Sequence, residues 1–171
     1  MAWTTPGTAT AGQVLTASFW NTQVRDNMVE LDDFFSGWTT YTPSITGAVT
    51  NPNLGSTGQA NGSYIKIGRL VIFTISIVAS GTGIAAGSGE YTFTVPVNYA
   101  SQPAAGFVTL GTGWVYNATS GRYMATLDNF GKSNNQGRIV INQAAAAIGS
   151  TNVSVQSEFS VAIFGHYQTA S

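Results

Sequence analysis

Short segments of alternating apolar and polar residues, separated by turn residues, follow one another from residue 38 onward. The clearest spans residues 69–80, where Val71, Phe73 and Ile75 recur at every second position, the period of a β-strand. The other face of this segment is also largely apolar, which indicates a central strand covered on both sides. About eight such segments predict a mainly β fold, an antiparallel β-sandwich of the jelly-roll type.

The predicted strands are residues 38–46, 63–67, 69–80, 90–96, 107–117, 122–128, 137–142 and 153–167. Residues 107–117 and 122–128 are expected to pair as a hairpin. Residues 143–149 include four consecutive alanines and fit either a single helical turn or a loop of small residues.

Residues 16–35 form the one convincing helical pattern in the sequence. Thr16 is placed to cap the first turn, because its hydroxyl can accept a hydrogen bond from a free backbone N–H. Apolar residues then recur at heptad-like spacing, which fits one helix packed on a domain or three short helices around an axis. The seam comprises Ala17, Trp20, Val24, Asn27, Leu31, Phe34 and Trp38. Asn27 is either buried, where it would fix the register, or solvated at the edge of the stripe.

The same helix concentrates charge, with five of the fourteen Lys, Arg, Asp, Glu and His side chains: Arg25, Asp26, Glu30, Asp32 and Asp33. Adjacent residues do not face each other on a helix, so Arg25 and Asp26 are each expected to need another partner. The acids near the C-terminal end are disfavoured by the helix dipole. These features predict a helix fitted to a basic or hydrogen-bonding partner surface, or simply a solvated acidic face.

Residues 1–15 are predicted to be an uncharged, extended arm. Its Trp3 is expected either to anchor in a partner's groove or to fold back on its own domain. Ser36 and Gly37 end the helix. We therefore expect two parts: an arm and helix for attachment and oligomerisation at residues 1–37, and a β-sandwich domain at residues 38–171.

Charge and composition exclude several classes of function. The net charge of −1 gives no electrostatic reason to expect a nucleic acid or an anionic membrane as partner. No apolar run approaches the roughly 18 residues of a membrane span, so no membrane insertion is expected. Charged residues make up 8% of the chain, against about 25% in ordinary soluble domains. The surface is therefore either wetted by neutral polar groups or buried in a permanent assembly.

The sequence offers little for catalysis or metal binding. One histidine, His166, and no cysteine leave few ligands, so no metal or other cofactor is expected. No Gly-x-Ser-x-Gly nucleophile elbow occurs. A glycosidase would need two facing carboxylates, and the β-region offers only Glu90, Asp128 and Glu158. We expect no enzymatic activity, with a glycan hydrolase as the weakest alternative.

Aromatic residues gather around the predicted hairpin. Trp114, Tyr116 and Tyr123 are the expected glycan-contact residues, because aromatic rings near a loop can stack on sugars. Neutral Asn, Ser and Thr side chains nearby suit sugar hydroxyls. The alternative is that Trp114 and Tyr116 share one strand face and fill the core.

Two stretches resemble a known family. The first is Thr16-Ala-Ser-Phe-Trp-Asn-Thr-Gln-Val-Arg-Asp-Asn-Met-Val-Glu-Leu31, preceded by Trp3-Thr-Thr-Pro and a Gly-x-Val-Leu-Thr turn. It resembles the N-terminal segment of minor tail and tail-fibre-like virion proteins of tailed bacteriophages. The second stretch is similar to the β-domain that commonly follows there. It comprises Tyr41-Thr-Pro, Asn51-Pro-Asn-Leu-Gly, Gly62-Ser-Tyr-Ile-Lys-Ile-Gly-Arg-Leu-Val-Ile-Phe and Gly87-Ser-Gly-Glu-Tyr-Thr-Phe-Thr-Val-Pro96.

The resemblance covers residues 1–100 and implies a virion structural protein assembled in the bacterial cytoplasm. It implies a homotrimer that contacts other virion proteins through residues 1–35 and presents its β-domain outward. Together with the aromatic residues of the hairpin, this makes a host-surface glycan the expected further partner. The attachment and oligomerisation residues would be Trp3, Trp20, Asn21, Val24, Arg25, Asp26, Asn27 and Leu31. A short fibre, a tail-tip component, a capsid decoration or head-fibre protein and a free carbohydrate-binding module are the alternatives.

Overall fold

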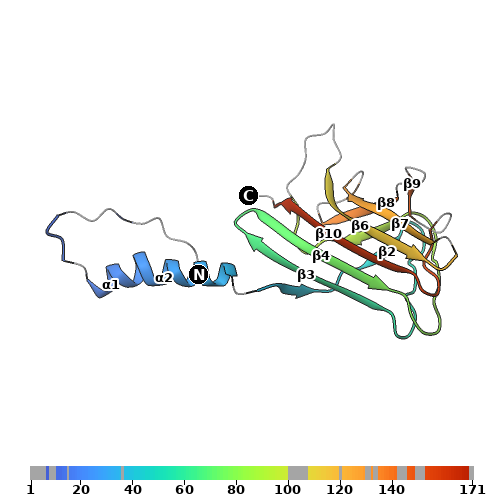
Figure 1. Ribbon diagram of the computed structural model, residues 1–171, viewed down its shortest axis with the longest axis horizontal. Coiled ribbons are helices and arrows are strands. Elements are labelled where there is room, and N and C mark those ends of the chain that lie inside the picture. Colours follow the sequence, from blue (N-terminus) through green and yellow to red (C-terminus); the bar gives the residue numbers. More distant parts are fainter. Residues whose placement is uncertain are drawn as a thin grey trace. The chain divides into compact units, whose positions relative to one another are not determined.

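The computed structural model of the chain divides into two compact units, Met1–Trp38 and Thr39–Ser171 (Figure 1). It describes residues 7, 11–14, 16–35, 37–99, 108–119, 121–129, 132, 135–141, 146–148 and 153–169. The boundary between the units lies one residue after the boundary predicted from the sequence.

The N-terminal unit contains the predicted helix, in three consecutive parts. These are α1 (Ala17–Trp20), a π-helical segment η1 (Asn21–Arg25) and α2 (Asp26–Phe35). Thr16 caps the helix as expected, since its Oγ1 accepts a hydrogen bond from the Phe19 N–H at 3.1 Å. Gly7, in the predicted arm, donates its N–H to the Gln23 side chain, so this part of the arm lies against the helix. Trp3 lies outside the described residues.

The π-helical segment alters the predicted heptad seam. In η1 the N–H of Asp26 bonds to the carbonyl of Asn21, five residues earlier, which adds one residue to that turn. Residues after it are therefore rotated about the axis relative to a regular helix. Asn27 is 5% exposed, whereas Trp20 and Leu31 are 54% and 49% exposed. The solvated interpretation of Asn27 is wrong: its amide donates to the Gln23 carbonyl at 3.2 Å.

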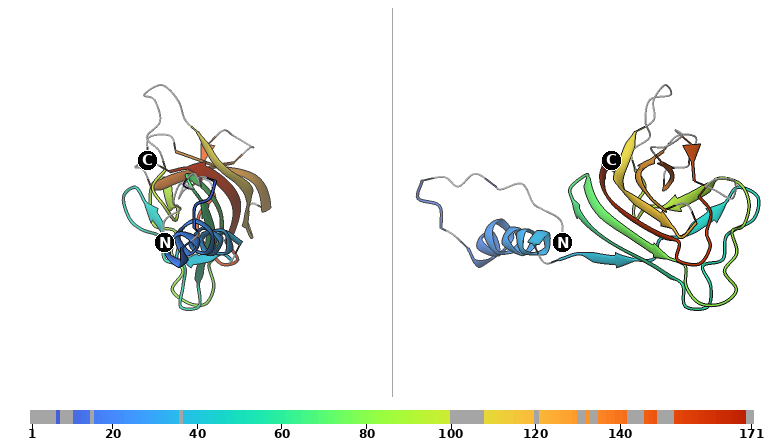
Figure 2. Two further views of the ribbon diagram at one scale, coloured as in Figure 1. Left: turned by 90° about the vertical axis from the view of Figure 1, so that its left-hand side faces the viewer. Right: turned by 45° about the vertical axis from the view of Figure 1, so that its right-hand side comes forward.

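The described part of the second unit contains ten strands, all paired antiparallel. The strands are β1 (Thr39–Tyr41), β2 (Ile45–Gly47), β3 (Gln59–Ile67), β4 (Leu70–Val78), β5 (Tyr91–Thr94), β6 (Thr109–Asn117), β7 (Gly121–Asp128), β8 (Gln136–Ile141), β9 (Ala146–Ala147) and β10 (Ser160–Gln168). Their order in the sheet is β1-β3-β4-β10-β6-β7-β8-β5-β2, with β9 beside β8. The sheet curls around one core (Figure 2), which confirms the mainly β, antiparallel sandwich-like fold preceded by a helix.

Three predicted segments differ in detail from the structure. Residues 38–46 form two strands, because the chain breaks around Pro43 and carries β1 and β2 to opposite edges of the sheet. Residues 153–167 contain a turn at residues 157–158, so β10 begins only at Ser160. Within residues 143–149, the short strand β9 pairs with β8. Both predicted alternatives, a helical turn and a loop, are therefore wrong for Ala146 and Ala147.

The core lies on the inner side of the curled sheet. On β4, Val71, Phe73 and Ile77 are fully buried, and the β10 neighbours Val161 and Ile163 are buried beside them. The other face of β4 is different. Leu70 and Val78 are 36% and 38% exposed. The prediction that this strand is covered on both sides is therefore wrong among the described residues, and the outer face of the sheet is left partly apolar.

Candidate functional site

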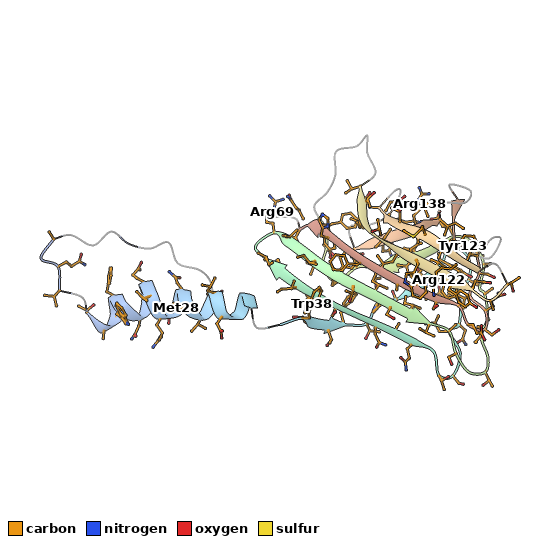
Figure 3. All side chains as sticks on the ribbon, viewed as in Figure 1. Met28, Trp38, Arg69, Arg122, Tyr123 and Arg138 are labelled. Carbon is orange, nitrogen blue, oxygen red and sulfur yellow. The ribbon has the colours of Figure 1, made fainter. Side chains whose placement is uncertain are left out.

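Two surfaces carry the residues expected from the sequence to have a function, one on each unit. The first is the exposed apolar surface of the N-terminal unit. Its members are large apolar side chains that are at least about one-third exposed: Val14, Trp20, Met28, Val29, Leu31 and Trp38. Met28, on α2, is 64% exposed (Figure 3). Units below about 40 residues rarely bury enough apolar surface to be stable alone.

The predicted attachment residues of the helix lie in different environments. Trp20 and Leu31 belong to the exposed apolar surface, whereas Asn21 and Val24 are half-buried in η1. Arg25 Nε and Nη2 both donate to Asp26 Oδ1, at 2.9 and 2.7 Å. The expectation that these neighbours would each need another partner is wrong, because the long Arg25 side chain folds onto the next residue. The Arg25 side chain is nevertheless 60% exposed.

The second surface is a groove on the outer side of the β-domain, with a volume of about 630 Å³. It lies over the ends of β4, β6 and β10, between the loop that follows β4 and the turn that precedes β10. Its lining includes two aromatic rings, one carboxylate and several hydroxyl groups: Val78, Ser80, Ile84, Trp114, Tyr116, Ser157, Glu158 and Ser160. A volume of roughly 300–1,000 Å³ with a few polar groups among apolar ones is typical of a small-ligand site.

The strand register explains why Trp114 and Tyr116 share this groove. They lie two residues apart on β6, opposite Ala162 and Ser160 of β10, and point to the outer face of the sheet. Both are half-buried. The Arg122 guanidinium lies over the Trp114 ring, with its Cζ 4.8 Å from the ring centroid. The alternative that Trp114 and Tyr116 fill the core is therefore wrong.

Tyr123 is not part of the groove. It pairs with the fully buried Val115 across the β6–β7 hairpin and packs against the core, on the inner face of the sheet. Figure 3 marks its neighbour Arg122, which alternates to the outer face and is exposed. The structure thus brings together two of the three expected glycan-contact residues and places the third on the opposite side.

Glu158, which was not among the predicted glycan-contact residues, lines the groove, whereas Tyr123 does not. Among the described residues it is the only non-glycine residue with a positive φ angle, at 61°. Its carboxylate Oε2 lies 3.5 Å from the Tyr116 hydroxyl. One sequence signal was available: Ser157 falls where the alternation of Val153, Val155 and Phe159 calls for an apolar residue, which marks a break in the strand.

The segment that carries Glu158 is held in place by hydrogen bonds on both sides. The Asn117 side chain is buried and donates to the Ser154 carbonyl at 2.7 Å. Gln156 donates to the Asn117 side chain and, at 2.7 Å, to Thr119 Oγ1. The Ala79 N–H donates to the Phe159 carbonyl at 2.8 Å, which joins the two walls of the groove. The groove is therefore largely formed before any ligand arrives.

The other two acids of the β-region lie together, away from the groove lining. Arg138 Nε bonds to Asp128 at 2.9 Å, and Arg138 Nη1 lies 3.5 Å from Glu90. Lys132 makes a further ion pair with Glu90. This network links β5, β7 and β8, with the Asp128 side chain only 8% exposed. Cations hold both carboxylates, which favours a structural role for them over the facing acid and base of a glycosidase.

His166 lies on the outer face of β10 and is exposed. Among the described residues, no group of three or more His, Asp or Glu side chains is arranged to hold a metal ion. No helix in the described ranges has the length and apolar character needed to cross a membrane.

Comparisons of this chain with protein-family models, with curated proteins and with solved structures find no match in any of the three.

Proposed function

We propose that this chain is a structural protein of a tailed-bacteriophage virion. The N-terminal unit attaches it to other virion proteins through residues 1–35 and associates with two further copies of itself. The β-domain faces outward, for contact with a host-surface glycan. The same architecture would serve a capsid decoration or head-fibre protein.

The observation that carries the proposal is the exposed apolar surface of the N-terminal unit. Trp20, Met28 and Leu31 are each about half exposed or more, in a unit that contains only 38 residues. A helix with this much uncovered apolar surface gains free energy by packing against another protein chain. The resemblance of residues 16–31 to virion attachment segments indicates which kind of chain that is.

The β-domain, in contrast, has a core of its own. Buried side chains from β4, β5, β6, β7, β8 and β10 form one continuous cluster. It does not depend on a partner to bury its large apolar residues on the inner face. This supports an attached, displayed domain, and the small-ligand groove on its outer side supports contact with a saccharide.

The mass of the purified full-length chain in solution tests the self-association. Light scattering should give about three times the chain mass of 17.9 kDa. Met28→Ser combined with Leu31→Ser should shift the population towards monomer, because both changes remove exposed apolar surface from the helix. Met124→Ser is the matched control, since Met124 is 66% exposed on the β-domain.

A monomeric wild-type chain would contradict the trimer. It would favour the second candidate, a free carbohydrate-binding module, which the groove with Trp114, Tyr116 and Glu158 also supports.

A further inference from the structure

We infer that the groove at the ends of β4, β6 and β10 binds a neutral saccharide, with Trp114 and Tyr116 as the apolar contact and Glu158 as acceptor for two adjacent sugar hydroxyls. This inference rests on the proposed glycan contact and gives it a site and a ligand class. Four features of the groove carry it: its aromatic wall, its hydroxyl groups, the backbone of Glu158 and the charge of its lining.

The aromatic wall suits the C–H face of a sugar ring. Trp114 and Tyr116 project side by side from the outer face of β6, and Val78 and Ile84 add aliphatic surface to the lining. Both rings are only half-buried, so part of each remains available to a ligand. Tyr and Trp combine a large apolar surface with few rotatable bonds, and ordering them on binding therefore costs little entropy.

The polar groups of the groove suit the rim of such a ring. Ser80, Ser157 and Ser160 contribute hydroxyl groups from two segments of the chain, the loop after β4 and the turn that leads into β10. A hydroxyl group donates one hydrogen bond and accepts others, which matches the donors and acceptors of a sugar. The Thr57 hydroxyl donates a hydrogen bond to Ser80 Oγ at 3.1 Å, which helps to hold the Ser80 side chain in the groove lining.

Glu158 has a backbone conformation that its side chain does not favour. With φ at 61° it occupies the left-handed region, which costs a non-glycine residue roughly 1–2 kcal/mol. A glycine would fit this turn without that cost. A glutamate here places a carboxylate beside the Tyr116 hydroxyl, 3.5 Å away, at the edge of the aromatic wall. Strained residues held by their surroundings are characteristic of ligand sites.

The charge of the lining selects the ligand class. Of the described residues that line the groove, Glu158 alone carries a charge. Its carboxylate has acceptor oxygens for adjacent hydroxyls, and hydrogen bonds to an ionised acceptor are the stronger kind. The same charge repels a uronate or another acidic sugar. The Arg122 guanidinium lies over the Trp114 ring and is not among the described lining residues, so Glu158 is the charged group that a ligand in the groove would contact directly.

Titration of the full-length chain with four trisaccharides tests the inference. Cellotriose, maltotriose and triacetylchitotriose are the neutral probes, and trigalacturonic acid is the acidic one. Calorimetry should detect binding of at least one neutral probe with a Kd of about 1 mM, typical of a weak single-site interaction, and no binding of the acidic probe. Failure of all three neutral probes, or tighter binding of the acidic one, would overturn the inference.

Three variants locate the site. Trp114→Ala and Glu158→Gln should each raise the Kd of the neutral probe that binds by about tenfold, a change that corresponds to about 1.4 kcal/mol. Met124→Ala should leave the Kd unchanged, because Met124 pairs with Trp114 across the hairpin but does not line the groove. Glu158→Gln preserves side-chain size on an exposed residue, so it reports on the charge even if Trp114→Ala unfolds the domain. Unchanged binding by Glu158→Gln would overturn the role of the carboxylate.

The mass of the chain distinguishes this inference from the proposed function. A trimer that binds no neutral probe would overturn the groove inference alone. A monomer that binds one would overturn the virion trimer and leave the groove intact.

Discussion

At the scale of single residues, the turn before β10 holds a glutamate in a backbone conformation that favours glycine. Glu158 has φ at 61°, whereas its neighbour Ser157 does not have a positive φ. Both side chains are exposed. Glycine should relieve strain at residue 158 but not at residue 157. Comparing glycine substitutions at these two exposed positions therefore measures the conformational cost of Glu158.

Glu158→Gly should raise the free energy of unfolding by about 0.5–1 kcal/mol, because relief of left-handed strain exceeds the added entropy of glycine in the unfolded chain. Thermal unfolding measures the change. Ser157→Gly, the control, should instead lower stability by a similar amount. A loss of stability in Glu158→Gly would show that the carboxylate supports the turn, and would weaken the case that it is kept for a ligand.

Tyr41 is a second residue with an unusual environment. Its ring covers Gly62, where a Cβ atom would lie 2.3 Å from Tyr41 Cε1. Its buried hydroxyl has no hydrogen-bond partner among the described residues. Burial raises the pKa of Tyr41 strongly, with a smaller contribution from Tyr167, whose own pKa burial raises to about 12.

These tyrosines should make the β-domain sensitive to alkali. A pKa raised in the folded state means that the folded chain holds its proton more tightly, so stability is complete below the unfolded pKa of about 10 and falls as pH rises above it. Urea unfolding at several pH values should show this loss. Tyr41→Phe should reduce this loss and cost little stability at neutral pH, because the hydroxyl makes no hydrogen bond to any described residue. An identical alkaline loss in Tyr41→Phe would contradict this account.

At the scale of elements, the ion-pair network ties three neighbouring strands together. Arg138 on β8 reaches Asp128 on β7 and Glu90 beside β5, and Lys132 binds the same glutamate. The burial of Asp128 makes the pairing energetically important, because a buried charge without its partner is costly.

Arg138→Gln should therefore lower the free energy of unfolding by about 2 kcal/mol or more. Arg122→Gln is the control, since Arg122 is exposed on the outer face of β7 and loses only its contact with the Trp114 ring, so stability should change by about 1 kcal/mol or less. Denaturant unfolding of the two variants compares them. Equal effects would show that the network contributes no more than a surface charge.

Much of this element-level architecture was predictable from the sequence. The alternation of Val71, Phe73 and Ile75 identified β4 and its buried face, and the turn residues between 117 and 122 identified the β6–β7 hairpin. The N-cap at Thr16 followed from its hydroxyl. These features depend on local spacing, which is visible in a single sequence.

The features that could not be predicted depend on contacts between distant segments. The π-helical segment in the helix rotates the seam, and no period in residues 16–35 indicates it. β1 and β2 lie at opposite edges of the sheet because β1 pairs with β3 and β2 pairs with β5. Tyr123 points inward because its register opposite Val115 is set by the hairpin pairing. For the same reason, the meeting of Glu158 with Tyr116 needed the structure.

At the scale of the whole molecule, charge is distributed in an unusual way. The β-region holds few charged residues, and four of them, Glu90, Asp128, Lys132 and Arg138, bind one another. Its outer face exposes Leu70, Val78, Met124 and Phe164 instead. Neutral hydroxyl and amide groups must therefore keep the surface wet. Low charge and exposed apolar side chains favour association of a protein at high concentration.

We propose that the chain belongs to a virion and is held there by its N-terminal unit. Cryo-electron microscopy of purified phage particles assembled with this chain tests it most directly. We expect three copies around an axis, with Trp20, Met28 and Leu31 covered by neighbouring virion chains and the β-domain on the outer surface. Particles that lack the chain, or that hold it through the β-domain with residues 16–35 uncovered, would contradict the account.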